Sequence, residues 1–561
     1  VENNTDNNDI SAADLAAGVE VEIVSDADAG DENIGDVTLG LNLASGTADE
    51  MTVTLKGTTG HALASNTIDL LTISNVETIN LVSSHVGTTT ASLLTSNDDN
   101  TITSLAIAGA TALNITGTDE IGVTMGANTT LASIDASTMA KDVALTTTNV
   151  TTTAGTSIKT GSGNDTITMG ASLTNVDSID AGANAGSTGE DTLVATVTSL
   201  TATTGALTVA NVERLQLTNA GSATIDATAI TGATEISFDT TTATTITGLD
   251  ATTAVGIGFF NTDSATAEAG TYTMSLADET GASDTLTVNL NDTATANTST
   301  VTLKSNTTVE NVAIVVNDTT DTAMANSSLT VSALNAAKIT VTGSNGDVGN
   351  TMTLNTLDTD TTTVDASGYY GILTASAGSA TATTFTAMSG AAHNFTGSSV
   401  NDTFTISGGT ANAAYTVDGN GGTDTLTIDL VTGAIDLDGV SDVDTVTLNV
   451  GGSKAATFGV DANTSDGLNA ATTVNVTGGD SLSTLSIGVT PTGDYTAAHA
   501  TTDADGTFGG LTAATTTLFD ASAYLGTLSN VVFTSNGLDE SVTVIGGAST
   551  TDTIQISDSA T

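Results

Sequence analysis

The chain has 561 residues, of which 63 are acidic and 7 are basic, so its formal net charge is −56. The few lysines and the arginine are scattered singly and form no basic stripe, which excludes nucleic acid as a partner. Cysteine is absent, which excludes both a disulfide framework and a cysteine-ligated zinc site.

About a fifth of the residues are threonine, and this composition favours short strands and turns over helices. Hydrophobic residues make up 39% of the chain and fall in short alternating runs, which predicts a folded chain rather than a disordered one. No apolar run approaches the ~18 residues that a membrane-spanning helix needs. A surface this acidic predicts screening or bridging by cations, through divalent metal, high salt or both.

Residues 1–45 are predicted to form an acidic N-terminal leader, which begins with the polar run "VENNTDNNDISAAD". Any signal peptide is expected to have been removed or omitted, because Val1 starts the chain without a charged and apolar leader. Four β modules are predicted to follow, at residues 46–188, 189–280, 281–420 and 421–561. No proline-rich linker separates them, so we expect modules packed end to end.

Each module opens with a turn that runs into an alternating strand, which we call the first signature. Its four copies are "GTADEMTVTL", "GEDTLVATV", "GASDTLTVNL" and "GGTDTLTIDL". A second signature with a valine and an acidic residue follows each copy, as "SNVETINLV", "ANVERLQLT", "TVENVAIVV" and "SDVDTVTLNV". The acidic residues of the two signatures lie 28, 22, 26 and 20 residues apart, as the pairs Asp49/Glu77, Asp191/Glu213, Asp284/Glu310 and Asp424/Asp444. This regularity indicates a structural repeat.

The valine of the second signature is predicted to face the core, because it shares one strand face with later apolar residues. The four such residues are Val76, Val212, Val309 and Val443. A tighter version between Gly161 and Gly182 places its two acidic residues, Asp165 and Asp177, only 12 residues apart.

Shorter apolar pulses recur about every ten residues between turn residues, which is typical of a β-solenoid or a β-sandwich. Threonines stacked in register on a solenoid face can hydrogen-bond with one another while their methyl groups pack. We therefore predict an all-β, repeat-built chain of β-solenoid or parallel β-helix-like modules. The alternative is that some modules are β-sandwiches.

Two glycine turns resemble single copies of a calcium-binding nonapeptide: "DGNGGTDTL" from Asp418 and "GSGNDTITM" from Gly161. Such turns bind calcium through aspartate carboxylates and backbone carbonyls of neighbouring coils. The candidate calcium ligands are Asp424, Asp418, Asp165, Asn164, Asp191 and Asp402. Because the copies are not in tandem, an adjacent coil or protomer would have to complete the oxygen shell. The alternative is a turn capped by an aspartate hydrogen bond, without metal.

A catalytic function is not expected. Carboxylate pairs carry no information among 63 acidic residues, and aromatic platforms for sugars are scarce, since aromatics make up 3% of the chain. The four histidines stand apart, without a metalloprotease or nucleophile motif, and are expected at surface or turn positions. They are His61, His85, His393 and His499.

The paired signatures, followed by pulses such as "TTITGLDATTAVGI", resemble the surface-layer (S-layer) proteins of Gram-negative bacteria of the Caulobacter and Campylobacter kind. They are also similar to acidic S-layer proteins of marine gammaproteobacteria. The resemblance covers most of the chain from about Gly46. It implies secretion, a β-rich fold stabilised by calcium, and self-assembly into a two-dimensional lattice on the outer cell surface.

The expected function is therefore that of a structural subunit of a secreted surface layer or biofilm matrix, whose main partner is a second copy of itself. Lipopolysaccharide or the outer-membrane surface is a further candidate partner. Two alternatives stay open: a β-helical adhesin that binds a glycan or a host surface, and a polysaccharide-degrading β-helix enzyme.

Overall fold

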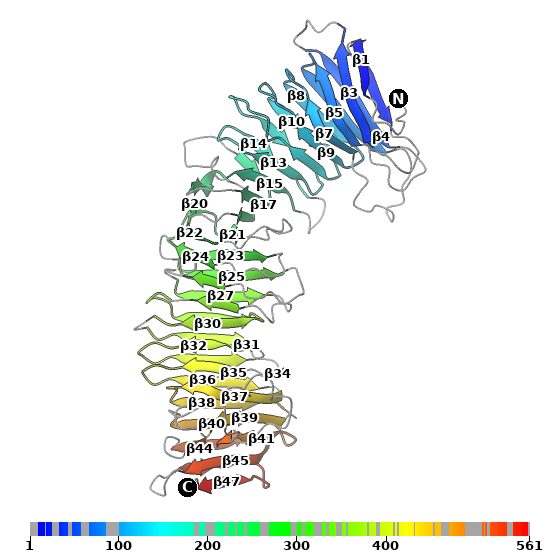
Figure 1. Cartoon of the computed structure of the whole chain (residues 1–561). Helices are drawn as coiled ribbons and strands as arrows, with labels where there is room; N and C mark the ends of the chain where they lie inside the picture. The colour runs from blue at the N-terminus through cyan, green and yellow to red at the C-terminus, as the bar shows by residue number, and fades with distance from the viewer. Residues whose placement is uncertain are drawn as a thin grey trace. The chain divides into compact units, whose positions relative to one another are not determined.

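The chain folds into stacked coils of parallel strands, as seen in a computed structural model (Figure 1). It divides into two compact units, Val1–Gly256 and Ile257–Thr561. The described residues are 9–16, 18–24, 33–42, 46, 48–57, 67–85, 100–184, 190–196, 208–218, 223–230, 233–239, 244–257, 269–292, 300–305, 309–318, 328–331, 336–343, 351–354, 357–378, 381–388, 393–407, 410–411, 414–430, 432–452, 455–461, 471–487, 508–509, 511–512, 517–535 and 542–558.

In the first unit, successive strands alternate between two parallel sheets. The first sheet contains β1 (Ile10–Leu15), β3 (Asn33–Leu41), β5 (Thr67–Ser74), β7 (Asn100–Ala106), β9 (Ile121–Met125), β11 (Val143–Thr146), β13 (Thr166–Gly170), β15 (Thr192–Thr196), β17 (Arg214–Thr218), β19 (Glu235–Asp239) and β21 (Ala254–Ile257). The second sheet contains β2 (Glu20–Val24), β4 (Glu50–Gly57), β6 (Thr78–His85), β8 (Ala112–Gly117), β10 (Ser133–Asp135), β12 (Ser157–Lys159), β14 (Ser178–Asp180) and β16 (Thr208–Ala210). Near the end of the unit, β18 (Ala223–Asp226) pairs with β20 (Thr244–Leu249), and the short 3-10 turn η2 (Ala227–Ala229) follows β18.

The second unit repeats this plan. Its first sheet contains β23 (Thr285–Asp292), β25 (Asn311–Asp318), β27 (Lys338–Gly343), β29 (Thr363–Gly368), β31 (Thr384–Met388), β33 (Thr403–Ser407), β36 (Thr425–Leu430), β38 (Thr445–Val450), β40 (Thr473–Gly478), β44 (Leu518–Tyr524) and β46 (Thr543–Ile545). Its second sheet contains β22 (Ala269–Leu276), β24 (Thr300–Ser305), β26 (Ser328–Val331), β28 (Thr351–Leu354), β30 (Ile372–Ser376), β32 (Asn394–Thr396), β34 (Thr410–Ala411), β35 (Ala414–Asp418), β37 (Thr432–Ser441), β39 (Ala455–Asp461), β41 (Thr484–Ile487), β42 (Phe508–Gly509), β43 (Leu511–Thr512), β45 (Thr527–Ser535) and β47 (Ile554–Asp558).

The strands pair in parallel, each with its counterpart one coil away. Among the described strands, one contact departs from this: two residues of β39 pair antiparallel with β42. A β-sandwich would require antiparallel neighbours throughout. The prediction of an all-β, solenoid or parallel β-helix-like repeat fold is therefore confirmed, and the solenoid is the correct choice over the sandwich.

The core lies between the two sheets and is built from alternate residues of each strand. Leu193, Leu215 and Ile236 stack in register on β15, β17 and β19, and all three are fully buried. In the second unit two phenylalanines stack in the same way: the Phe385 and Phe404 rings lie 5.3 Å apart and are nearly parallel. Like side chains thus pack on like from coil to coil.

The four signature valines confirm the predicted core face. Val76, Val212, Val309 and Val443 have relative exposures of 2%, 0%, 0% and 1%. The described residues contain no helix that is both long and apolar enough to cross a bilayer. The leader and the four-module division at residues 46, 189, 281 and 421 stay predictions.

Candidate functional site

The acidic residues of the two signatures meet one another across consecutive coils. Each lies directly before a strand, and the backbone N–H of the first donates to the carboxylate of the second. The four contacts are Asp49 N to Glu77 Oε2 at 2.8 Å, Asp191 N to Glu213 Oε2 at 2.7 Å, Asp284 N to Glu310 Oε2 at 3.1 Å and Asp424 N to Asp444 Oδ2 at 2.8 Å. The repeat spacings of 28, 22, 26 and 20 residues are therefore the lengths of single coils.

Two of these contacts extend into rows of three, which we call carboxylate ladders. The N-terminal ladder consists of Asp165, Asp191 and Glu213, and the C-terminal ladder of Asp402, Asp424 and Asp444. Asp165 N donates to Asp191 Oδ1, and Asp402 N donates to Asp424 Oδ1, both at 2.7 Å. Each ladder thus hydrogen-bonds successive coils at the point where a strand begins.

The second carboxylate oxygen binds the turn of its own coil. Asp165 Oδ2 accepts from Gly161 N at 3.1 Å, and Asp402 Oδ2 accepts from Ser398 N at 2.6 Å. Asp284 and Asp552 repeat this contact with Gly281 N and Gly547 N. One buried carboxylate therefore joins its own turn to the preceding coil, and hydrogen bonds to such charged acceptors are stronger than neutral ones.

Asp424, in the turn "DGNGGTD", departs from this rule. Its side chain is fully buried, and Oδ2 has no hydrogen-bond partner although the whole turn is described. A Cβ atom on Gly419 would lie 2.7 Å from this oxygen and 2.0 Å from Asp442 O. Only glycine fits there, and the turn passes directly against an unsatisfied carboxylate oxygen. Asp191 Oδ2 is also unpaired among the described atoms, but residues 185–189 of its turn lie outside the described part.

Burial raises the pKa of Asp424 to about 6 and that of Asp191 to about 7. The N–H bonds from Asp402 and Asp165 oppose these shifts. Neighbouring carboxylates add to them: Asp402, Asp444 and Asp442 around Asp424, and Asp165, Glu213 and Asp142 around Asp191. Burial and the neighbouring carboxylates thus both disfavour the charged form of the ladder residues. Bound protons or cations therefore stabilise the ladders.

Of the candidate calcium ligands, the structure brings Asp165 together with Asp191 and Asp402 together with Asp424. Asp418 Oδ1 accepts from Asn420 N at 2.9 Å, so this aspartate caps its own turn. Asn164 donates its N–H to Asp142 Oδ1 at 2.7 Å. Within the described ranges, no three His, Cys, Asp or Glu side chains converge as a metal site. Calcium binding therefore stays a prediction.

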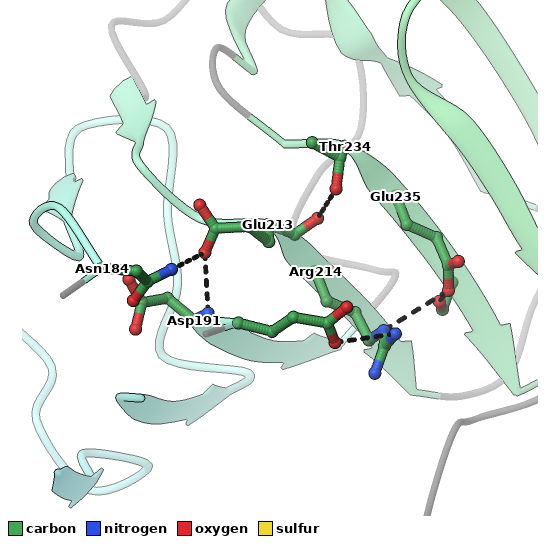
Figure 2. A network of polar contacts seen from close by, with 8 residues as sticks. Asn184, Asp191, Glu213, Arg214, Thr234 and Glu235 are labelled. Carbon is green, nitrogen blue, oxygen red and sulfur yellow. Dashed lines mark hydrogen bonds and ion pairs between the residues drawn. The ribbon is translucent and has the colours of Figure 1, made fainter. Parts of the chain in front are cut away.

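The second-signature acids, especially Glu213 and Asp444, were not among the predicted site residues, although they accept the bonds between coils. The recurrence of such an acidic pair 20 to 28 residues apart in all four repeats was the available signal. The arginine beside Glu213 adds an ion-pair bridge (Figure 2): Arg214 Nη2 lies 3.0 Å from Glu190 Oε2, and Nε lies 3.5 Å from Glu235 Oε1. Asn184 Nδ2 also donates to Glu213 Oε2 at 2.8 Å.

The expectation for the histidines is wrong at His393, which is 1% exposed. Its Nδ1 accepts from Leu373 N at 3.2 Å, and its Nε2 lies 2.6 Å from Met388 O. The ring continues the aromatic stack, 5.7 Å from Phe395. Burial lowers the pKa of His393, so it is a neutral core residue. His61 and His499 lie outside the described residues, and the side chain of His85 is likewise not described.

Lowering the pH from about 8 to about 5 should strengthen the C-terminal ladder. The folded pKa of Asp424, about 6, is above its ordinary value of 3.8, so its stabilising effect is complete below 3.8 and is lost as the pH rises through about 6. Urea midpoints measured in chelator should therefore decrease as the pH rises from about 5 to about 8. The decrease should be smaller in Asp424→Asn.

The matched control for this experiment is Asp278→Asn, because Asp278 is exposed and bonds only Thr280 of its own turn. Both variants lose one charge, and His393, whose lowered pKa acts in the opposite direction, is the same in both. A pH dependence in Asp424→Asn as steep as that of Asp278→Asn would contradict the assignment to the ladder.

Comparison of the chain with protein families, with curated proteins and with solved structures gave no match. The class defined by the fold and the site is a parallel β-solenoid protein whose coils are joined by carboxylate ladders.

Proposed function

We propose that this chain is a structural subunit of a secreted, self-assembling two-dimensional surface layer or biofilm matrix, held together by calcium. Its partners are further copies of itself, and lipopolysaccharide or the outer-membrane surface is the proposed support. The proposal assigns no catalytic role.

The net charge of −56 on a repeat-built solenoid carries the proposal. Several of the few cationic groups among the described residues are engaged within the chain, for example Lys56 with Glu22 at 2.6 Å and Lys338 with Asp365 at 3.6 Å. Two copies therefore repel each other, and regular contacts between them need bound cations to neutralise the opposing carboxylates. The repetitive parallel sheets supply the regular faces that a lattice requires.

Asp424 is the ladder residue that fits calcium best. Asp165 and Asp402 each engage both carboxylate oxygens with N–H donors, whereas Asp424 Oδ2 is unpaired beside the glycine turn. Calcium binds about 6 to 8 oxygens at about 2.3–2.6 Å, more than this turn offers, so an adjacent coil or a second copy that reaches the turn would supply the remainder. When bound there, calcium would neutralise the ladder and bridge the copies.

The test is electron microscopy of the purified chain in calcium, in magnesium at equal ionic strength, and in EDTA. Ordered sheets should form with calcium and dissolve on chelation, while far-UV circular dichroism retains its β signal. Asp424→Asn should require more calcium for assembly than Asp278→Asn, which removes the same charge from an exposed turn. Sheets that persist in EDTA at low ionic strength would contradict the calcium proposal, and discrete monomers under all conditions would contradict the lattice.

A further inference from the structure

Six consecutive strands of the second unit carry two columns of outward-facing residues, which we call the threonine array. The strands are β29, β31, β33, β36, β38 and β40. The first column is Thr363, Thr384, Thr403, Thr425, Thr445 and Thr473, and the second is Asp365, Thr386, Thr405, Thr427, Thr447 and Asn475. The four central strands therefore each present two threonines in the pattern Thr-x-Thr, with one buried residue between them.

The array is regular because no bulge interrupts it. Pairing from β29 to β40 keeps a constant register, whereas the register shifts between β27 and β29 before the array and between β40 and β44 after it. The residues beneath the array are fully buried: Val364, Phe385, Phe404, Leu426, Val446 and Val474. The stacked phenylalanine rings add rigidity, so the outer face is a regular, well-supported surface.

The threonine hydroxyls of the central strands face solvent with most of their hydrogen-bonding capacity unused. The one bond within the chain found for these eight side chains joins Thr425 Oγ1 to Thr403 Oγ1 at 3.4 Å. Threonines just before the same strands behave differently: Thr362 and Thr472 donate to backbone carbonyls of the preceding coil, Ala337 O and Asp444 O. The array hydroxyls are thus available to an external ligand made of donors and acceptors.

The centre of the array is also uncharged. Its four central strands carry no acidic or basic residue among the eight array positions, although the chain has 63 acidic side chains. An uncharged patch without large apolar groups, bordered by Asp365 on β29 and Asp429 on β36, gives a protein partner little surface to desolvate favourably. Threonine instead offers a methyl group beside each hydroxyl, which can order water without binding it as tightly as an ion does.

The regular spacing of the array in two directions favours a ligand that is itself a regular lattice. Neighbouring strands lie about 4.8 Å apart, and residues two apart on a strand lie about 6.6 Å apart. Ice is such a lattice, because its water oxygens form a regular array of hydrogen-bond donors and acceptors that repeats every few ångströms. We propose that the threonine array binds ice through an ordered layer of water. This function is separate from assembly and requires neither calcium nor a second copy.

The experiment uses the full chain in EDTA, so that ice binding is measured without assembly. Ice crystals grown in the protein should become faceted and show thermal hysteresis, and the protein should be enriched in slowly grown ice. In Thr405→Leu/Thr427→Leu, the ice-bound fraction should fall roughly tenfold, as when central residues of an interface are replaced. The variant Thr405→Val/Thr427→Val keeps the shape of the side chains and removes only their hydroxyls. It therefore tests the role of the array in ice binding if the leucine variant folds poorly.

The control is Thr416→Leu, because Thr416 is exposed on β35 of the other sheet. It should bind ice as the wild type does. Round, freely growing crystals with the wild-type chain would overturn the proposal. So would unchanged ice binding in both double variants, or a dimer in EDTA that the double variants abolish.

Discussion

Replacing Val443 by aspartate is expected to unfold the coils around β38. Val443 is 1% exposed and sits one residue before Asp444 of the C-terminal ladder. The new carboxylate would be buried without a partner, beside a row of carboxylates where burial, and then like charge, already raises the pKa of Asp424. We expect the free energy of unfolding to fall by about 4 kcal/mol or more, which exceeds the effect of most substitutions.

The measurement is urea unfolding followed by circular dichroism, with Val400→Asp as the matched control. Val400 is 37% exposed in the turn before β33, so its replacement should lower the urea midpoint far less. Because each coil of a solenoid is stabilised mainly by its neighbours, Val443→Asp should also increase proteolysis within the second unit. Equal midpoints for the two variants would show that Val443 does not support the core.

The second large effect is expected from Asp402→Ala. Asp402 is 2% exposed, and it accepts from Thr383 N at 2.6 Å and from Ser398 N at 2.6 Å. Alanine leaves both buried N–H groups without an acceptor, and each such loss costs about 1–3 kcal/mol. We therefore expect the free energy of unfolding to fall by about 3–5 kcal/mol.

Asp402→Asn separates the two contacts in this experiment. Its remaining carbonyl oxygen can accept only one of the N–H groups well, while the amide turns a donor toward the other, so its destabilisation should be lower than that of alanine but still measurable. Asp278→Ala is the exposed control and should change stability little. If Asp402→Ala unfolds at the same urea concentration as Asp278→Ala, the ladders do not hold the coils together.

Much of the fold could be predicted because the repeat is visible in the chain. The valines at 76, 212, 309 and 443 occupy the same place in each second signature, and alternation along a strand puts that place inside. The choice between solenoid and sandwich stayed open, because both architectures use short alternating strands. The site was predicted only in part: Asp424 and Asp402 were selected as metal ligands, whereas their contact with each other was not foreseen.

The sequence by itself determined the strand-forming composition, the strong negative charge, the buried valines and the spacing of the signature acids. Only the tertiary structure decided that this spacing is one turn of a coil. The physical reason is that the partner of each ladder carboxylate is a backbone N–H. Every residue except proline has this group, so the residue type at a position does not show which N–H the carboxylate will bind. Coil length varies from 20 to 28 residues between the paired signature acids, so only the stacking of the strands shows which residues meet.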